Sequence, residues 1–182
     1  MKKLVYVLFV SIAFVACRGE EKKVASPIFI ENEVNKFITS NPDWGKDEAT
    51  QEATTDKFQR KLINLSNEPG FLNGMPLKFS SVTDTTESGQ AVKIANFIAY
   101  NDNNRPMGSL LNYAQLHIKG IVSDEQLKKL KVGENYTLQG NLQRQGKRAD
   151  IKFIKVSDFR GYDLGKYTFL ITGFEPLKKA EL

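Results

Sequence analysis

The side chains that most often carry catalysis or bind metal ions are scarce in this chain. His117 is the only histidine and Cys17 the only cysteine among 182 residues. A zinc site with two or three histidine ligands is therefore excluded. A Ser-His-Asp triad would have to use His117, and no G-x-S-x-G turn is present to carry the serine. We expect His117 to be a surface or edge histidine.

Two acidic segments have spacings that permit chemistry, but turns explain both more simply. Asp158 and Asp163, in SDFRGYDLG, could pair as a general acid and base. Asp102, within NDNNRPMG, offers an oxygen ligand for calcium, although the spacing is not that of an EF-hand. Both segments are rich in turn-forming residues. No phosphate-binding glycine motif is present either, so the sequence predicts no enzymatic activity, no catalytic residues, no cofactor and no metal site.

The single cysteine follows a short apolar run at the N-terminus. Lys2 and Lys3 precede an apolar segment, Leu4 to Ala16, that only Ser11 interrupts. A membrane-spanning helix needs about 20 apolar residues, so this run has the length of a secretory signal instead. The charged residues after it predict a flexible tether over residues 17–25.

The segment Phe14-Val15-Ala16-Cys17 resembles the lipobox of bacterial lipoproteins, with Phe14 where leucine is usual. In that family the cysteine sulfur carries diacylglycerol and the signal is cut just before it. The resemblance implies a signal peptide over residues 1–16 and a lipidated Cys17. Lipidation would also explain a lone exported thiol, because exported thiols tend to form disulfides. The alternative is an ordinary or uncleaved signal with a chance cysteine.

The lipoprotein resemblance also implies a location. The protein would be held in the cell envelope, at the outer membrane, facing either the periplasm or the cell surface. Glu20-Glu21 is similar to the acidic export signal of surface lipoproteins in the Bacteroidetes group. Each buried acyl methylene adds ~0.8 kcal/mol to attachment, and more than one chain makes the anchor stable.

The charge of the chain is unevenly distributed. The formal net charge is +5, and residues 18–182 hold 24 basic and 21 acidic residues. Residues 18–110 have a net charge of −2, whereas residues 111–182 have a net charge of +5. The C-terminal half could therefore present a basic face, although a mixed solvated surface is the simpler interpretation.

Residues 26–73 have the pattern of a helical segment. Ser26 and Pro27 suit the N-cap and first position of a helix that ends at Asn41-Pro42. A second helix is predicted over Lys46 to Leu65. Apolar residues recur at helical spacing in both: Ile30, Val34, Phe37, Ile38, Phe58, Leu62 and Leu65. We expect these stripes to be core.

Residues 74–182 change to the two-residue period of strands. Alternating segments are MPLKFSSV, AVKIANFIAY, YAQLHIKGIV and NYTLQGNLQ. DIKFIKV changes register in its middle, which predicts a bulge, and KYTFLITGF is apolar on both faces, as in a buried strand. A short helix from Ser123 to Lys131 interrupts the strands. The predicted class is mainly β with N-terminal helices (α+β), with an antiparallel sheet that closes on itself.

The order of three strands, a helix and further strands resembles the OB fold. The stretch LKVGENYTLQGNL resembles the turn and glycine-containing strand that follow the helix there. The resemblance implies an antiparallel OB-like barrel with one inserted helix over residues 74–182. KYTFLITGF is an additional strand, which would extend the sheet or cover an edge.

OB folds bind oligomers on their second and third strands and on adjacent loops. That resemblance implies ligand contacts from Lys93, Phe97 and Lys119, with Phe97 stacking on a base or sugar. The loop Asn141 to Arg148 would add Arg144, Lys147 and Arg148, although it could equally be an ordinary hairpin loop.

The function predicted from the sequence is a lipid-anchored, non-enzymatic binding or assembly module of the cell envelope. Its partners would be the membrane, through the anchor, and an envelope protein. The alternative is an OB-fold protein that binds an oligonucleotide or oligosaccharide. Nucleic acid is the less expected ligand, because export removes the protein from the cytoplasm.

Overall fold

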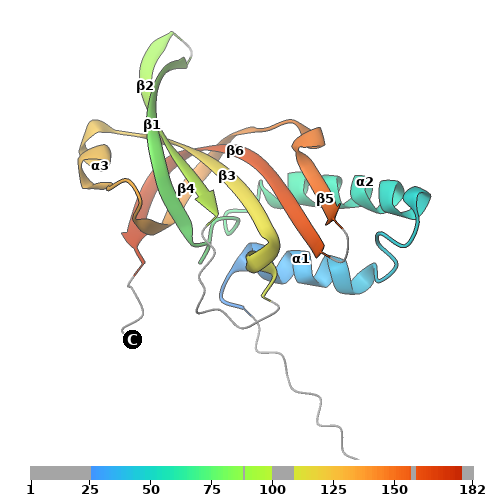
Figure 1. Cartoon of the computed structure of the whole chain (residues 1–182). Coiled ribbons are helices and arrows are strands. Elements are labelled where there is room, and N and C mark those ends of the chain that lie inside the picture. The colour runs from blue at the N-terminus through green and yellow to red at the C-terminus, as the bar shows by residue number, and fades with distance from the viewer. Residues whose placement is uncertain (1–25, 88, 100–108, 157–158, 178–182) are drawn as a thin grey trace, which may run out of the picture.

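The computed structural model describes residues 26–87, 89–99, 109–156 and 159–177. It shows a curved sheet of six strands with two helices against one end and a short helix at the other (Figure 1). The fold is therefore mainly β with helices at the N-terminal end, as predicted. The predicted signal peptide, tether, Cys17, Asp102 and Asp158 lie outside the described residues.

The two N-terminal helices are α1 (Phe29–Ser40) and α2 (Glu48–Leu65). Asp47 caps α2 by accepting a hydrogen bond from the Thr50 backbone N–H at 2.8 Å. The predicted N-cap of α1 was wrong: the helix begins after Ile28. The Ser26 hydroxyl accepts from the Ile28 N–H and donates to Glu31 Oε2, so it braces the segment before the helix instead.

The strands form a closed ring. They are β1 (Leu77–Glu87), β2 (Gln90–Ala99), β3 (Ala114–Val122), β4 (Asn135–Gln145), β5 (Ile151–Val156) and β6 (Phe159–Pro176). β1 pairs with β2 and β4, β2 with β3, and β6 with both β3 and β4, which closes the circuit. Every pairing is antiparallel except that of β3 with β6, which is parallel. The far ends of β1 and β2 project beyond the ring as an exposed hairpin (Figure 1).

β4 and β5 are two parts of one interrupted strand path. Both run antiparallel to β6 along the edge that β3 does not occupy, β4 against residues 167–176 and β5 against residues 159–164. Residues 146–150, which include the short 3-10 helix η2 (Arg148–Asp150), make the detour between them. The hairpin loop predicted from Asn141 was therefore wrong, because residues 141–145 belong to β4 and because β4 and β5 do not pair.

Two further predictions about the last strands need correction. β5 pairs with β6 in one continuous register, so the bulge expected in DIKFIKV is absent there. The ladder of β4 with β6 instead shifts register between Gln139 and Gly140 and again between Leu142 and Arg144. β6 neither extends the sheet nor covers an edge: it is the strand that closes the ring.

The inserted helix α3 (Asp124–Lys129) joins β3 to β4, within the predicted range. Ser123 and Gln126 form a reciprocal capping box at its start. Gln126 Nε2 also donates to the Ile171 carbonyl at 3.0 Å, which attaches the helix to β6.

The helices and the ring share one hydrophobic core. Trp44, in the turn between α1 and α2, packs its ring against Phe58 and Phe153, each with 4.8 Å between ring centroids. Tyr162 of β6 also contacts Trp44. The predicted stripes are confirmed, because Ile30, Val34, Phe58 and Leu62 are buried and Phe37, Ile38 and Leu65 pack on this core. The helices are thus bound to the sheet by aromatic packing.

Candidate functional site

Two basic residues lie on either side of a threonine on the outer face of the ring. Leu116, Ile118 and Gly120 of β3 and Tyr167, Phe169 and Ile171 of β6 are buried in or against the core, so the residues between them face outward. Lys119 of β3 and Arg144 of β4 are both register partners of Thr168 on β6. Thr168 therefore lies between a lysine and an arginine on one line across the sheet.

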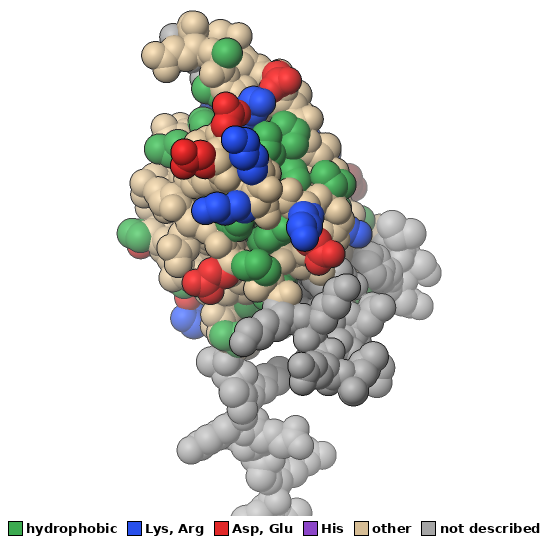
Figure 2. All heavy atoms as spheres, turned by 90° about the vertical axis from the view of Figure 1, so that its left-hand side faces the viewer, with side chains coloured by type: hydrophobic (Ala, Val, Ile, Leu, Met, Phe, Trp, Pro, Cys, Tyr) green, Lys and Arg blue, Asp and Glu red, His purple; other side chains and the backbone are tan. Residues whose placement is uncertain are grey.

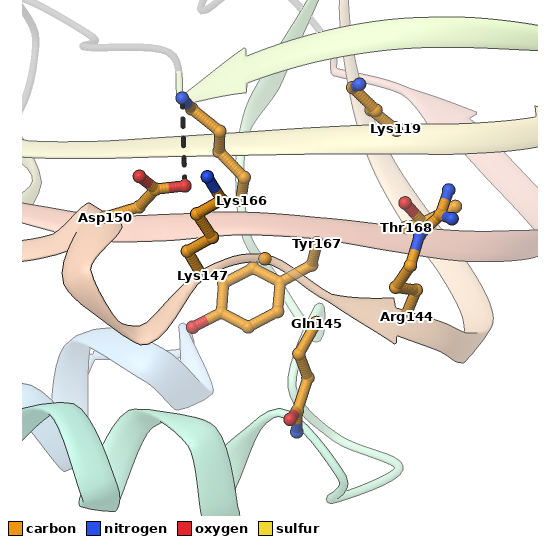
Figure 3. Close-up of a pocket in the computed structure, with 9 residues that line it drawn as sticks. Lys119, Arg144, Gln145, Lys147, Asp150, Lys166, Tyr167 and Thr168 are labelled. Carbon is orange, nitrogen blue, oxygen red and sulfur yellow. Dashed lines mark ion pairs between the residues drawn. The ribbon is translucent and has the colours of Figure 1, made fainter.

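These residues line a hollow of about 380 Å³, which we call the basic hollow (Figure 3). Four of its side chains are basic. The lining residues are Lys119, Arg144, Gln145, Gly146, Lys147, Asp150, Lys166, Tyr167 and Thr168. In Figure 3 Lys147, Lys166 and Asp150 lie toward one end, and Lys119, Arg144 and Thr168 toward the other. The detour between β4 and β5 thus forms one wall of the hollow.

The lining residues of the basic hollow carry more positive than negative formal charge. Its four basic side chains face one carboxylate, Asp150, which lies 3.9 Å from the Lys166 Nζ. That contact is long for an ion pair and half exposed on the lysine side, so it neutralises little of the field.

Hydrogen bonds to the surrounding structure hold two side chains that line the basic hollow, Tyr167 and Gln145. Tyr167 is buried, its hydroxyl donates to the Leu164 carbonyl at 2.9 Å, and burial with the nearby Asp163 charge raises its pKa far above the usual range. Gln145 Nε2 donates to the Ile63 carbonyl and to the Ser66 hydroxyl, both at 2.9 Å. Figure 3 shows both side chains directed toward the helices, so they position the site without offering groups to a ligand.

The structure brings together three of the six predicted binding residues, Lys119, Arg144 and Lys147. Arg148 lies elsewhere: its Nε donates to Gln59 on α2 and its guanidinium pairs with Asp56. Lys93 pairs with Asp124 at the start of α3, with 3.3 Å between the charged atoms. The expectation that Phe97 faces outward was wrong, since it is 1% exposed and packs against Phe79 in the core.

Sequence reasoning missed Lys166 and Thr168. The segment KYTFLITGF was interpreted as apolar on both faces, but Lys166 and Leu170 are exposed and Tyr167, Phe169 and Ile171 are buried. The alternation of lysine and threonine with aromatic residues was a usable signal. His117, half-buried on β3, lies opposite Lys166 on the same outer face, in keeping with the expected surface histidine.

A second groove, of about 960 Å³, lies between α2 and β5. Its α2 wall carries Glu48, Glu52 and Asp56, and its β5 wall carries Lys152 and Phe153. Asp56 is already paired with Arg60 and Arg148. Gln59 Nε2 donates to the Ile151 carbonyl and spans the groove. This groove is the weaker candidate, because its walls carry charges of both signs and the Gln59 side chain crosses it.

The face around α3 shows no single charge. Lys, Arg, Asp and Glu side chains are interspersed there with apolar ones (Figure 2). The uneven charge of the sequence is therefore not gathered at this end.

Neither a metal site nor a membrane-spanning helix is found in the described part of the chain. No group of three or more His, Cys, Asp or Glu residues there is arranged to hold a metal ion. None of the helices within the described ranges is long and apolar enough to cross a membrane. The turn predicted for SDFRGYDLG was wrong from Phe159 onward, because Asp163 lies within β6 and pairs with Lys152 of β5. Asp163 Oδ1 accepts a hydrogen bond from the Gly165 N–H.

Comparison of the chain with protein-family models, with curated proteins and with solved structures found no match.

Proposed function

We propose that this protein is a lipid-anchored component of the cell envelope, attached through Cys17, whose ring of strands acts as a non-enzymatic binding module. The lipid anchor rests on the N-terminal sequence alone. The binding role is supported by the basic hollow, where residues from three strands and one loop converge although they are far apart in the sequence.

We further propose that the ring is an OB-like barrel. The ring order β1-β2-β3-β6-β4, the parallel contact of β3 with β6 and the helix between β3 and β4 support this interpretation. In it, β6 takes the place of the fifth strand, and β4 with β5 together take the place of the fourth. The basic hollow then lies on the outer surface of β3, β6 and β4. OB folds bind their ligands on the second and third strands and on adjacent loops, so the two surfaces share β3.

The second candidate function, oligonucleotide or oligosaccharide binding, is favoured only for an acidic oligosaccharide. Single-strand nucleic acid binders combine positive charge with aromatic rings on which bases stack. Phe97, the ring proposed for that purpose, is buried, and Tyr167 in the hollow is buried as well. The basic hollow offers cations without such a ring, and an envelope protein would be the alternative partner.

Membrane fractionation and intact mass of the mature chain test the anchor. The wild-type chain should be in the membrane fraction with a diacylglycerol-sized mass increase on Cys17, and Cys17→Ala should lose both. A soluble, unlipidated wild-type chain that still begins at Met1 would remove the anchor from the proposal.

Charge reversal tests the binding face. The double variant Lys119→Glu/Arg144→Glu should lose retention of an envelope component that the wild-type chain retains on a column. The matched control is Lys128→Glu/Lys129→Glu, which makes the same charge change on α3. Equal retention by the two double variants would show that the outer face of β3, β6 and β4 is not the binding site.

A further inference from the structure

We infer that the groove between α2 and β5 binds an extended peptide segment of a partner protein, and that this segment carries lysine or arginine side chains. The groove shares no lining residue with the basic hollow. The inference therefore goes beyond the proposed function, and each of the two can fail without the other.

The first observation is the free edge of β5. Among the described strands β5 pairs only with β6, and its other edge lies beside α2 (Figure 1). The Ile151 carbonyl accepts a hydrogen bond from Gln59 on α2, and the Ile151 N–H donates to the Arg148 carbonyl. Both backbone groups of Ile151 therefore point away from β6. In an antiparallel pair this direction recurs at every second residue, so the N–H and C=O of Phe153 point the same way.

These backbone groups of Phe153 face the groove, because Phe153 is one of its lining residues. Within the described part of the chain, no backbone group outside the pairing of β5 with β6 bonds to them. An edge with unpaired donors and acceptors can pair with another extended chain. The groove thus offers backbone hydrogen bonds as well as space.

The α2 wall of the groove is acidic. Glu48 and Glu52 are exposed on it, one helical turn apart, and no ion pair in the described ranges engages either. Asp56, the next acid along this wall, is already paired with two arginines. Lys152 on the β5 wall lies between two core residues, so its side chain points to the other face of the strand. The groove is therefore complementary to a chain with basic side chains directed at α2.

The dimensions of the groove suit a short extended segment. α2 lines it from Glu48 to Gln59, about 17 Å along the helix axis at about 1.5 Å per residue. An extended chain covers that length in about five residues, at about 3.3 Å each. The α2 wall also includes Ala49 and Ala53, whose small side chains leave room for the backbone of a bound chain.

A second copy of this chain fits the groove less well than a basic partner. The strand that another copy would most readily offer is β1, in the hairpin that projects beyond the ring (Figure 1). The charged residues of that part of β1 are Asp84 and Glu87. Pairing it with β5 would bring these acids to the acidic wall of α2, which is unfavourable.

Fluorescence anisotropy of labelled peptides with the full chain, purified in a non-ionic detergent, tests the inference. The first probe is a short capped peptide of alternating lysine and threonine, and the second replaces each lysine with glutamate. We expect the basic peptide to bind and the acidic peptide not to bind. The affinity should fall as salt is added, because Glu48 and Glu52 are exposed.

Methylated peptides test the pairing with β5. In an extended chain the N–H groups of alternate residues point to the same edge. N-methylation of the lysines alone, or of the threonines alone, therefore removes the donors of one edge of the basic peptide. One of the two methylated peptides should lose binding and the other should keep it, because only one edge can face β5.

Variants assign the binding to the groove. Glu48→Gln/Glu52→Gln should weaken binding of the basic peptide about threefold to tenfold, because two exposed ion pairs are lost. Ala53→Arg places a long cation in the groove and should abolish binding, while arginine keeps the helix. The matched control, Glu125→Gln/Glu134→Gln, makes the same charge change outside the groove and should leave the affinity unchanged. Thermal unfolding should show that all three variants are folded.

Several results would overturn the inference. No binding of the basic peptide, or equal binding of the acidic one, would remove the charge complementarity. Equal binding of both methylated peptides would remove the pairing with β5. Binding unchanged in Ala53→Arg would place the peptide outside the groove, and self-association of the full chain that Ala53→Arg abolishes would make a second copy the occupant. None of these results bears on the basic hollow, which the variant Lys119→Glu/Arg144→Glu tests separately.

Discussion

Replacement of Gly146 by alanine should both destabilise the protein and disturb the basic hollow. Gly146 begins the detour between β4 and β5, and its N–H donates to the Lys166 carbonyl at 2.7 Å. A Cβ at this position would lie 2.6 Å from that carbonyl oxygen and 3.1 Å from the Lys166 Cβ. The detour and β6 would have to move apart, because the contacted oxygen belongs to the Lys166 backbone.

The magnitude follows from two opposing effects. Overpacking of this kind costs about 1–3 kcal/mol. The alanine also restricts the unfolded chain, which returns roughly 0.4–1 kcal/mol. A net loss of about 1–2 kcal/mol corresponds to a fall in Tm of roughly 2–8 °C for a domain of 150–250 residues.

Gly173→Ala on β6 is the matched control. Its Cβ would meet the Gln139 Oε1 at 3.2 Å, the end of a flexible side chain, and its other neighbours are at 3.8 Å. We expect its Tm to stay within about 2 °C of the wild type or to rise slightly. Thermal unfolding by circular dichroism gives both Tm values. An unchanged Tm for Gly146→Ala would refute the assigned close approach of the detour to β6.

Three further predictions concern the helices. Phe58→Ala removes a buried ring that contacts Trp44 and should cost about 3–5 kcal/mol in urea unfolding, whereas a loss below 1 kcal/mol would show that the aromatic cluster does not hold the helices. Asp47→Ala removes the cap of α2 and should cost about 1 kcal/mol, with Asp47→Asn close to wild type. The pKa of Glu33 is lowered by hydrogen bonds from Lys36 and Lys61, so its stabilisation is complete above the unfolded-state pKa and is lost as pH falls through the lower folded value. Unfolding between pH 6 and pH 2 should therefore show a smaller acid-induced loss of stability in Glu33→Gln, and identical profiles would contradict this.

The sequence predicted the helices well because their ends carry local signals. Asn41-Pro42 and the Asp47 cap bound the turn between α1 and α2, and the capping box around Ser123 marks α3. These signals depend on neighbouring residues alone. The start of α1 was misplaced because Ser26 bonds to Glu31 and to the Ile28 N–H, a choice that depends on packing around Glu31.

The face of β2 could not be predicted by counting apolar residues. Val92, Ile94 and Ile98 are the large aliphatic residues of β2, yet Ala95 and Phe97 belong to the core cluster, whereas Ile94 is buried outside it and Ile98 is 38% exposed. The large ring of Phe97 packs against Phe79. Burial of that ring stabilises the fold more than burial of the smaller aliphatic side chains on the other face of β2 would. The ladder of β1 with β2 also shifts register between Phe79 and Ser81, which no local pattern shows.

The basic hollow depends on pairings between distant segments. Lys119, Arg144 and Lys166 come from three strands, and only the register of β6 against β3 and β4 brings them together. The OB resemblance selected Lys119 and Arg144 because it assigned them to a ligand face. It failed for Lys166 because KYTFLITGF was treated as an extra strand instead of the strand that closes the ring.

The interruption between β4 and β5 links the site to the rest of the fold. Had β4 continued directly into β5, residues 146–150 would lie in the ladder and could not form a wall beside Lys166. The detour instead divides neighbouring basic residues between two tasks: Lys147 lines the hollow, while Arg148 reaches Asp56 and Gln59 on α2. Arg148 thus holds the detour against the helices, and Gly146 holds it against β6. The position of Lys147 in the site is therefore set by contacts on both sides of the loop.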